Sequence, residues 1–399
     1  VRLAMASSLS SSHDDARDGA AHRGGRFGAG IEREVETLAL ELFGGKTAVA
    51  GMSCGTQASL AVHGLVLESG DRVVAPLGRS DSRAELARRF NGCELIDLPM
   101  TQAGAELDLD RTESLLRDHG PRAVVVAGDV CLFSLPLAEL ASLCKAAGAW
   151  LIYDMTGVAG LIAGGELQPS VTEYAQLVYC GSGGTLHCPE HGLAVARDGA
   201  LEEPLRELSS ALQASSAHPH GLAAMGVALS ELQQHGSEYA RQAVLNARAL
   251  AEGLAEAGCA VRHMALGATR SHIIELEHPD PRLALLLLSR AGLRCAAGEA
   301  EEGVEQGAGV LRLGSQVVTR RGMAESEMAI LAESLIDVLY RGRSPEMIHY
   351  DLVRNLAGHF TGVAFSSDAS LDRRPDWYDT PLRELGQQEP LARIRQLAP

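Results

Sequence analysis

One segment carries the clearest structural signal in this sequence: Trp150-Leu-Ile-Tyr-Asp154-Met-Thr-Gly-Val-Ala-Gly-Leu-Ile-Ala163. Residues 151–153 form a short apolar run that ends on an acid, and a turn rich in Gly and Ala follows. The pattern predicts a buried strand that delivers Asp154 to its C-terminal end. Ligands of open α/β sheets bind outside the carboxyl ends of the strands, so a carboxylate there is placed for chemistry. A helix-cap or turn aspartate is the alternative, and this segment alone does not decide between the two.

The composition is that of an acidic protein of enzyme size. Its 399 residues, 46% of them hydrophobic, are enough for two domains with a full core. The formal charge of −16 disfavours nucleic acid or an anionic membrane surface as a partner, because both attract clustered Lys and Arg. The apolar runs are too short for a membrane span or a secretory signal. The eight cysteines lack a C-x-x-C pair, which is typical of reduced thiols in a cytoplasmic protein.

Further elements follow from periodicity and turn signals. An amphipathic helix is expected over 31–43, and a strand over 47–50 leads into Gly51-Met-Ser-Cys-Gly55-Thr56-Gln57, which opens a second helix. The small residues of that turn allow backbone N–H groups and the helix dipole to face an anion. A long helix is expected over 227–257. The other expected elements are strands over 71–75, 123–127, 193–196, 260–264 and 271–277, a helix near 281–292, and a strand around Arg312.

Three motifs resemble those of the serine hydroxymethyltransferase family, a fold-type-I family that uses pyridoxal phosphate. The segment that starts at Asp154 is similar to the family's Asp-Met-Ala-His-Ile-Ala-Gly-Leu. The turn at Gly55-Thr56-Gln57 is similar to its phosphate cup, Ser-Gly-Ser-Gln-Ala-Asn. The segment that starts at Gly309 and contains Arg312 is similar to its Gly-Leu-Arg-Ile-Gly-Thr. The resemblance covers about residues 16–340.

The resemblance implies an α/β fold of the fold-type-I PLP-transferase class. Such a fold has a large domain with a mainly parallel mixed sheet and a smaller α+β C-terminal domain. We therefore expect an irregular N-terminal arm at 1–30, a large cofactor-type domain at 31–226, and a long helix with the small domain at 227–342. Residues 343–399 form a divergent C-terminal extension with a helix or two. The resemblance also implies a homodimer, in which the loop at 215–220 helps to complete the neighbouring subunit's pocket.

The motifs assign roles to residues of the cofactor and substrate sites. The resemblance implies that Gly55 and Thr56 hold the cofactor phosphate and that Asp154 pairs with the pyridine nitrogen. Asp129 falls where the family has a serine close to the cofactor's phenolic oxygen, and a carboxylate there opposes the cofactor's own negative charge. Arg312 stands where the family clamps the substrate carboxylate, although an internal salt bridge is the alternative.

Two further positions are candidates for proton transfer. Asp18 falls where the family has its acid/base glutamate, and a solvated loop aspartate is the alternative. His187 lies three residues beyond the position of the family's lysine and is a candidate base. The same histidine, with Cys188 and His191, could be taken for a metal corner. No fourth ligand is spaced to complete it, so we expect no metal site.

The sequence departs from the family at its central residue. Residues 180–192 match Thr-His-Lys-Thr-Leu-Arg-Gly-Pro-Arg-Gly-Gly, and Gly184 stands where the family's lysine forms the Schiff base with the cofactor. The chain contains two lysines, Lys46 and Lys145, and neither falls near that position. Histidine positions of the family are also lost, namely those at Gly157, Gly183 and either Ser82 or Arg83. A guanidinium can still stack on a flat ring.

Two functional interpretations remain open. The first is a serine hydroxymethyltransferase-like enzyme that acts at the α-carbon of an amino acid of the serine/glycine type. It would transfer a one-carbon or aldehyde unit by an altered mechanism, with pyridoxal phosphate bound non-covalently and tetrahydrofolate as a further cofactor. The second is a non-catalytic subunit or ligand-binding protein that keeps the fold. Loss of the lysine favours the second interpretation, whereas survival of Asp154 and Arg312 favours the first.

Overall fold

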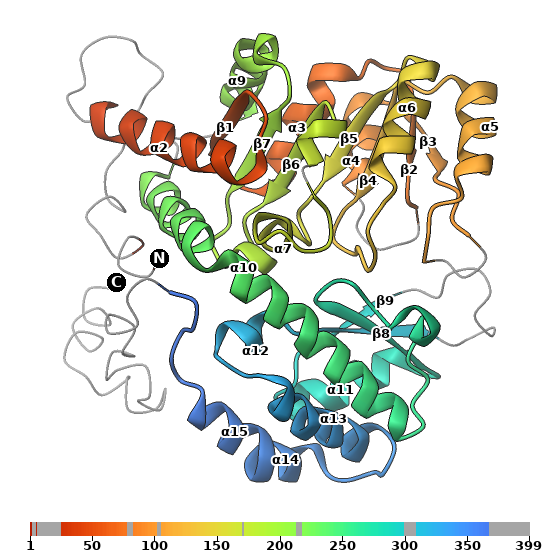
Figure 1. The fold of residues 1–399 in the computed structure, drawn as a ribbon, viewed down its shortest axis with the longest axis vertical. Helices are drawn as coiled ribbons and strands as arrows, with labels where there is room; N and C mark the ends of the chain where they lie inside the picture. Colours follow the sequence, from red (N-terminus) through yellow and green to blue (C-terminus); the bar gives the residue numbers. More distant parts are fainter. Residues whose placement is uncertain are drawn as a thin grey trace, which may run out of the picture.

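The computed structural model describes residues 1, 5, 25–77, 83–101, 105–169, 171–212, 218–298 and 309–366. Their polypeptide forms a large domain around a seven-stranded sheet and a small domain around a three-stranded sheet, joined by one long helix (Figure 1). The large sheet has the spatial order β1-β7-β6-β5-β4-β2-β3. Its strands are β1 (Thr47–Met52), β2 (Arg72–Ala75), β3 (Glu94–Asp97), β4 (Ala123–Ala127), β5 (Trp150–Asp154), β6 (Leu177–Gly181) and β7 (Gly192–Ala196).

The large sheet is mainly parallel, as expected. Strands β2 to β6 run parallel to one another, whereas β7 is antiparallel to both β1 and β6. β4 and β5 are aligned so that Ala127 lies opposite Asp154, which brings the C-terminal ends of both strands to one edge. The apolar run before Asp154 is buried on both faces of the sheet, since β5 has neighbours on either side and helices above and below.

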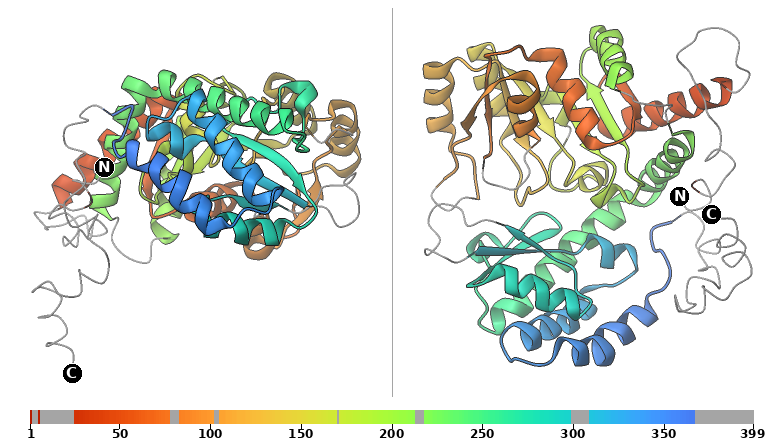
Figure 2. Two further views of the ribbon diagram at one scale, coloured as in Figure 1. Left: turned by 90° about the horizontal axis from the view of Figure 1, so that it is seen from below. Right: turned by 180° about the vertical axis from the view of Figure 1, so that it is seen from behind.

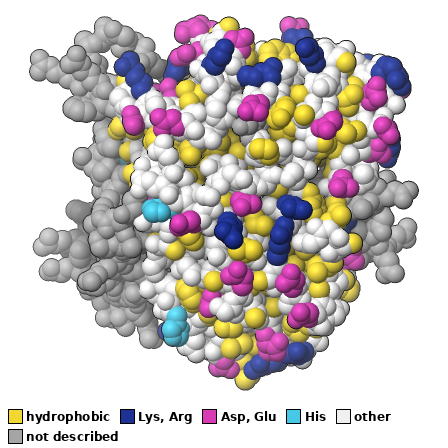
Figure 3. Space-filling view, in the orientation of Figure 1, with side chains coloured by type: hydrophobic (Ala, Val, Ile, Leu, Met, Phe, Trp, Pro, Cys, Tyr) yellow, Lys and Arg dark blue, Asp and Glu magenta, His cyan; other side chains and the backbone are white. Residues whose placement is uncertain are grey.

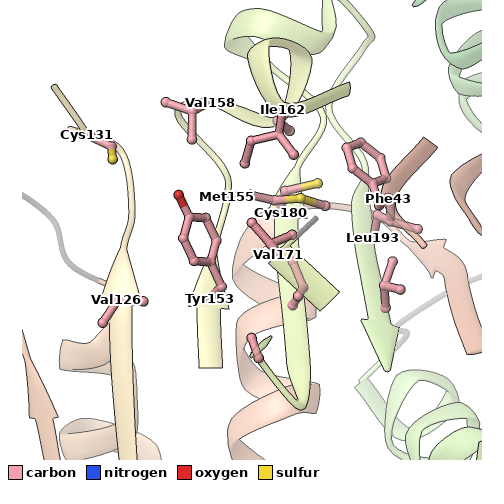
Figure 4. Close-up of a cluster of buried hydrophobic side chains, with 14 of the residues drawn as sticks. Phe43, Val126, Cys131, Tyr153, Met155, Val158, Ile162, Val171, Cys180 and Leu193 are labelled. Carbon is pink, nitrogen blue, oxygen red and sulfur yellow. The ribbon is translucent and has the colours of Figure 1, made fainter. Parts of the chain in front are cut away.

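Helices cover both faces of the large sheet. One face packs against α3 (Gly55–Val66), α4 (Ala84–Leu86) and α9 (Glu202–Leu212). The opposite face packs against a larger set, namely α2 (Gly25–Phe43), α5 (Leu109–His119), α6 (Leu137–Ala147), α7 (Ala159–Ala163), α8 (Val171–Tyr174) and the first half of α10 (Pro219–Glu256). In Figure 4, Phe43 of α2 and Ile162 of α7 lie over the strands, close to the buried side chains of Tyr153, Cys180 and Leu193.

The small domain is built on the second half of α10. Its antiparallel sheet has the order β8-β10-β9, with β8 (Ile273–His278), β9 (Ala296–Gly298) and β10 (Gly309–Gly314). Its helices are α11 (Pro281–Arg290), α12 (Gln316–Arg320) and α13 (Glu325–Leu339). After them come α14 (Pro345–Ile348) and α15 (Arg354–His359), which are the bluest helices in Figure 2. The fold is therefore that of the fold-type-I class expected from the sequence.

Three expected elements differ from the observed ones. Helix α2 begins at Gly25, six residues earlier than expected and inside the arm expected to be irregular over 1–30. The strand expected over 260–264 is wrong: Val261 makes a single bridge to Leu276, and the backbone then turns at His263 with a φ of 58°. The left-handed turn ends pairing with β8 before a strand can form. The long helix begins at Pro219, eight residues earlier than expected, because the proline occupies the first helical turn, where a missing N–H has no consequence.

None of the helices in the described part of the chain combines the length and apolarity that a membrane crossing requires.

Candidate functional site

The candidate site lies where β4, β5 and β6 end together. Asp154 is the last residue of β5, and its side chain is only 4% exposed. The backbone N–H of Thr156 donates a 3.0 Å hydrogen bond to Asp154 Oδ1. Burial raises the pKa of Asp154, and the nearby positive charge of Arg83 opposes that rise. The carboxylate expected at the C-terminal end of a buried strand is therefore present, and it is buried.

Arg83 supplies the positive charge of the site. Its Nη1 lies 2.8 Å from Asp129 Oδ1 and 3.6 Å from Asp154 Oδ2. The first contact is a charge-assisted hydrogen bond, whereas the second is an ion pair whose atoms are too far apart for a hydrogen bond. Arg83 therefore neutralises the carboxylate that was expected to oppose a bound cofactor. Its Nε is buried and has no hydrogen-bond acceptor among the described residues.

The N-terminus of α3 faces the same place. Gly55 begins this helix, and no side chain of the preceding Cys54 caps its first N–H groups. A β-carbon on Gly55 would lie 2.8 Å from the backbone of Gly181 and 3.4 Å from Arg83 Nε. The helix start, the end of β6 and the guanidinium are therefore in contact. Thr56, in the first turn, is exposed, so its hydroxyl is accessible to a ligand.

Gly184 stands at the open side of the site. Its φ of 63° is left-handed, and a β-carbon there would lie 3.9 Å from the carbonyl oxygen of Thr156. Both Gly183 and Gly184 are exposed. Lys46 and Lys145 are exposed too, the first next to the start of β1 and the second in the last turn of α6. Neither lysine is part of the edge at which Asp154 lies.

His187 is close in sequence but has another partner. Its Nε2 lies 2.7 Å from the hydroxyl oxygen of Tyr239 on α10, and the two rings meet edge to face. Burial, helped by the positive charge of Arg320, lowers the pKa of His187 to about 3. No hydrogen bond or ion pair in the described part of the chain joins His187 to Asp154. The ring is therefore a weak base that already holds a partner on α10.

Arg312 lies in the small domain with a partner of its own. It is opposite Glu275 in the β8–β10 ladder, and its Nε donates a 3.0 Å hydrogen bond to Glu275 Oε1. Arg262 Nη1 lies 3.2 Å from the other carboxylate oxygen, Oε2. Burial alone would raise the pKa of Glu275, but His263 and the two guanidinium groups outweigh it and lower that pKa to about 2. The internal salt bridge named as the alternative for Arg312 is therefore present.

The structure brings together five of the residues expected from the sequence: Gly55, Thr56, Asp129, Asp154 and Gly184. It places His187 and Arg312 with other partners, and Asp18 lies outside the described residues. A role for Thr156 was not predicted from the sequence. Its hydroxyl accepts a 3.1 Å hydrogen bond from the N–H of Gly181 and so links the end of β5 to β6. A threonine two residues after a strand-ending acid was the available signal.

Among the described residues, no group of three His, Cys, Asp or Glu side chains is arranged to share a metal ion. The polar atoms of the site instead favour an anion. Arg83 Nε is an unpaired buried donor, and it lies beside the start of α3, where the N-cap side chain makes no capping hydrogen bond. These donors fit the phosphate group of the cofactor that the resemblance implies, and Asp154 fits its ring nitrogen. Gly184 has no side-chain amine and cannot attach the cofactor covalently.

Comparisons with known proteins give a family and several relatives. The serine hydroxymethyltransferase family model matches residues 3–335. The serine hydroxymethyltransferase of Pyrococcus abyssi is 32% identical over 339 residues, which are 80% of this chain and 79% of that protein. The corresponding protein of Korarchaeum cryptofilum is 30% identical over 361 residues, 84% of this chain and 82% of the relative.

A solved structure is similar over the whole chain. It is that of L-threonine transaldolase from Pseudomonas fluorescens in the internal aldimine state, with a TM-score of 0.83 and 26% sequence identity. The match covers 100% of this chain and 90% of that one. With the family model matched over most of its length and relatives at about a third identity, this chain belongs to the serine hydroxymethyltransferase family.

Proposed function

We propose that this protein acts on an amino acid of the serine/glycine type, as a serine hydroxymethyltransferase-like transferase that holds pyridoxal phosphate without a covalent link to a lysine. The observation that carries the proposal is the unpaired buried donor, Arg83 Nε, beside the open N-terminus of α3. A buried donor without an acceptor is unfavourable by about 1–3 kcal/mol, so a bound anion would relieve that penalty. The helix dipole favours the same charge.

Each end of the cofactor has a matching group in this site. The N–H groups of Gly55 and Thr56, the Thr56 hydroxyl and Arg83 Nε would hold the phosphate. Asp154 would keep the ring nitrogen protonated, because a buried carboxylate is stabilised by a charged hydrogen-bond donor. The bound cofactor supplies an aldehyde and an electron-withdrawing ring that stabilises negative charge at the α-carbon of an amino acid. Tetrahydrofolate as carrier of the one-carbon unit is part of the proposal, on the basis of the resemblance alone.

The residues around the reacting end have positioning roles in this proposal. Asp129 holds the Arg83 guanidinium by its 2.8 Å hydrogen bond, so the charge of this carboxylate is neutralised and Arg83 is held beside the start of α3. The exposed backbone at Gly183 and Gly184 leaves space for the amino acid on the side where the family has its lysine. Arg312 uses Nε for Glu275, and its terminal nitrogens are the groups that would bind the substrate carboxylate.

Calorimetric titration tests this proposal. Pyridoxal phosphate should bind the wild-type protein more tightly when glycine or serine is present. Asp154→Asn should weaken that binding about tenfold or more, because a charged hydrogen bond in a buried site is lost. Asp118→Asn, at an exposed aspartate on α5, is the matched control and should bind as the wild type does. Borohydride should attach no cofactor to Lys46 or Lys145. Equal affinity of the Asp154 and Asp118 variants would refute the proposal.

A non-catalytic binding protein or subunit is the second candidate. It is favoured by the pairing of Arg312 with Glu275, because an arginine held inside its own domain is less available to a substrate carboxylate. For such a protein, no amino acid should change the affinity for pyridoxal phosphate. The same titration therefore separates the two candidates, and the Arg312 variant described below gives an independent check.

A homodimer is also part of the proposal. The family resemblance places the loop at 215–220 against the neighbouring pocket, and α2 presents a partly apolar helix at the surface of the large domain (Figure 1). Sedimentation velocity at micromolar protein should give a dimer. A stable monomer under these conditions would exclude a pocket completed by a second subunit.

A further inference from the structure

A pocket lies beside α10, at the junction of the two domains. Its volume is about 300 Å³, and it is lined by Ser134 and Glu166 of the large domain, Arg241 and Arg248 of α10, and Arg270 at the edge of the small domain. Leu167, Val244 and Leu245 form its apolar part. Figure 3 shows basic side chains gathered near the centre of this face, where α10 crosses between the domains. A volume of this size suits one small molecule.

The charges of this pocket are unusual for the protein. Three arginines and one glutamate give the lining a formal charge of +2, although the whole chain carries −16. No ion pair within 4.0 Å joins Glu166 to Arg241, Arg248 or Arg270 among the described residues. Opposite charges that share a pocket without pairing are available to a ligand.

The positions of the arginines are fixed by the fold. Arg241 and Arg248 are seven residues apart on α10, which separates their backbones by roughly 10 Å along one side of the helix. Arg248 is oriented by a 3.0 Å hydrogen bond from its Nε to the carbonyl of Thr269. The backbone N–H of Arg270 donates a 2.8 Å hydrogen bond to the carbonyl of Leu132, which ties this residue to the large domain. Two separated cationic ends therefore face one cavity.

We propose that this pocket binds an acidic amino acid, a molecule with two carboxylates and one ammonium group. The separated arginines match the two carboxylates, and Glu166 matches the ammonium. The apolar patch of Leu167 and Val244 matches the methylene groups between them. Because the pocket is lined by both domains, its occupant bridges them. The site is separate from the one at Asp154, and the inference does not depend on the proposed function.

Calorimetry without pyridoxal phosphate tests this inference with three related probes. L-Glutamate should bind best, glutarate more weakly because it lacks the ammonium, and L-glutamine more weakly because it lacks the second carboxylate. Arg241→Gln and Arg270→Gln should each weaken L-glutamate binding about tenfold or more. Both arginines are exposed, so these variants should fold. Glu166→Gln should remove the preference for L-glutamate over glutarate.

Two controls make the result specific. Arg117→Gln, at an exposed arginine on α5, should leave L-glutamate binding unchanged. Asp154→Asn should also leave it unchanged, which distinguishes this pocket from the candidate cofactor site. The inference is overturned if L-glutamate gives no heat at about 10 mM, which corresponds to an affinity too weak for a built site. It is equally overturned if L-glutamine binds as well as L-glutamate, or if the pocket variants bind like the wild type.

Discussion

Arg83 Nη1 lies 3.6 Å from Asp154 Oδ2, and this ion pair joins the residue directly before α4 to the end of β5. Asp154 is buried, so removing its nearest positive charge leaves an uncompensated carboxylate in a medium of low dielectric constant. The same guanidinium holds Asp129 at 2.8 Å. Arg83 is therefore both a structural counter-charge and the donor that the proposed phosphate site needs.

Arg83→Gln should destabilise the protein by about 3 kcal/mol, as is typical when one partner of a buried pair is removed. Asp154→Asn in the same chain should recover part of that loss, because no buried charge then remains unpaired. Urea denaturation of the wild type, both single variants and the double variant gives the coupling free energy. Additive changes would show that Arg83 and Asp154 do not stabilise one another.

Gly184→Lys should restore covalent capture of pyridoxal phosphate. The left-handed φ of 63° makes any side chain there unfavourable by about 1–2 kcal/mol, but the nearest atom to its β-carbon is 3.9 Å away, so the lysine has room. Gly183→Lys is the matched control, since its φ of −67° is unstrained and its β-carbon has no heavy atom within 4 Å. Borohydride reduction followed by mass spectrometry should find the cofactor on residue 184 and not on residue 183.

How much of this could be read from the sequence depends on how local each signal is. β5, its terminal acid and the glycine-led start of α3 were predictable, because an apolar run and a turn of small residues are determined within about ten residues. Arg83 and Asp129 are 46 positions apart, and their hydrogen bond depends on β2 and β4 being neighbours in the sheet. No pattern in the sequence reports such a pair.

The roles of two candidate residues depended on packing in the same way. Arg312 meets Glu275 because β8 and β10 are aligned in one register, and a shift of two residues would give it another partner. His187 meets Tyr239 because α10 packs against the short 3₁₀ turn at Gly184–Leu186, which directly precedes His187. The motif at Arg312 predicted the strand correctly. It could not predict which carboxylate of the neighbouring strand would pair with the guanidinium.

Glu275→Gln should destabilise the protein more than Arg312→Met. The glutamine variant leaves Arg312 and Arg262 without their shared negative charge, whereas the methionine variant leaves Glu275 with Arg262 and His263. The depressed pKa of Glu275, about 2 in the folded state against about 4.5 when unfolded, corresponds to about 3 kcal/mol of stability at neutral pH. This contribution is present above pH 4.5 and is lost as the pH falls towards 2. Thermal unfolding at pH 7 and pH 3 measures both effects.

Arg312→Met also tests the substrate role. If the terminal nitrogens of Arg312 bind the amino-acid carboxylate, this variant should lose about tenfold or more of the effect of glycine on pyridoxal phosphate binding. The affinity for pyridoxal phosphate alone should stay as in the wild type, since Arg312 does not touch the phosphate or ring site. An unchanged effect of glycine would assign Arg312 to the stability of the small domain only.

His63 should make the protein acid-sensitive well above the range in which carboxylates titrate. It is fully buried on α3, its Nε2 has no partner among the described residues, and burial lowers its pKa to about 4. The unfolded chain takes up that proton near pH 6.5, so between pH 6.5 and 4 the unfolded state binds more protons than the folded one. The free energy of unfolding should therefore decrease as the pH is lowered from 6.5 to 4, by about 1.4 kcal/mol per pH unit for this group.

Replacement of the ring isolates the contribution of His63. Burial also lowers the pKa of His272 to about 4, so the wild type should lose stability more steeply than one group explains. His63→Leu should flatten the dependence by about 1.4 kcal/mol per pH unit. Tyr179→Phe is the matched control: Tyr179 packs edge to face on His63 at 5.8 Å, but a phenol does not titrate between pH 6.5 and 4. Urea denaturation at half-unit steps measures the slopes. If His63→Leu and Tyr179→Phe both have the slope of the wild type, burial does not lower the pKa of His63 in the folded protein.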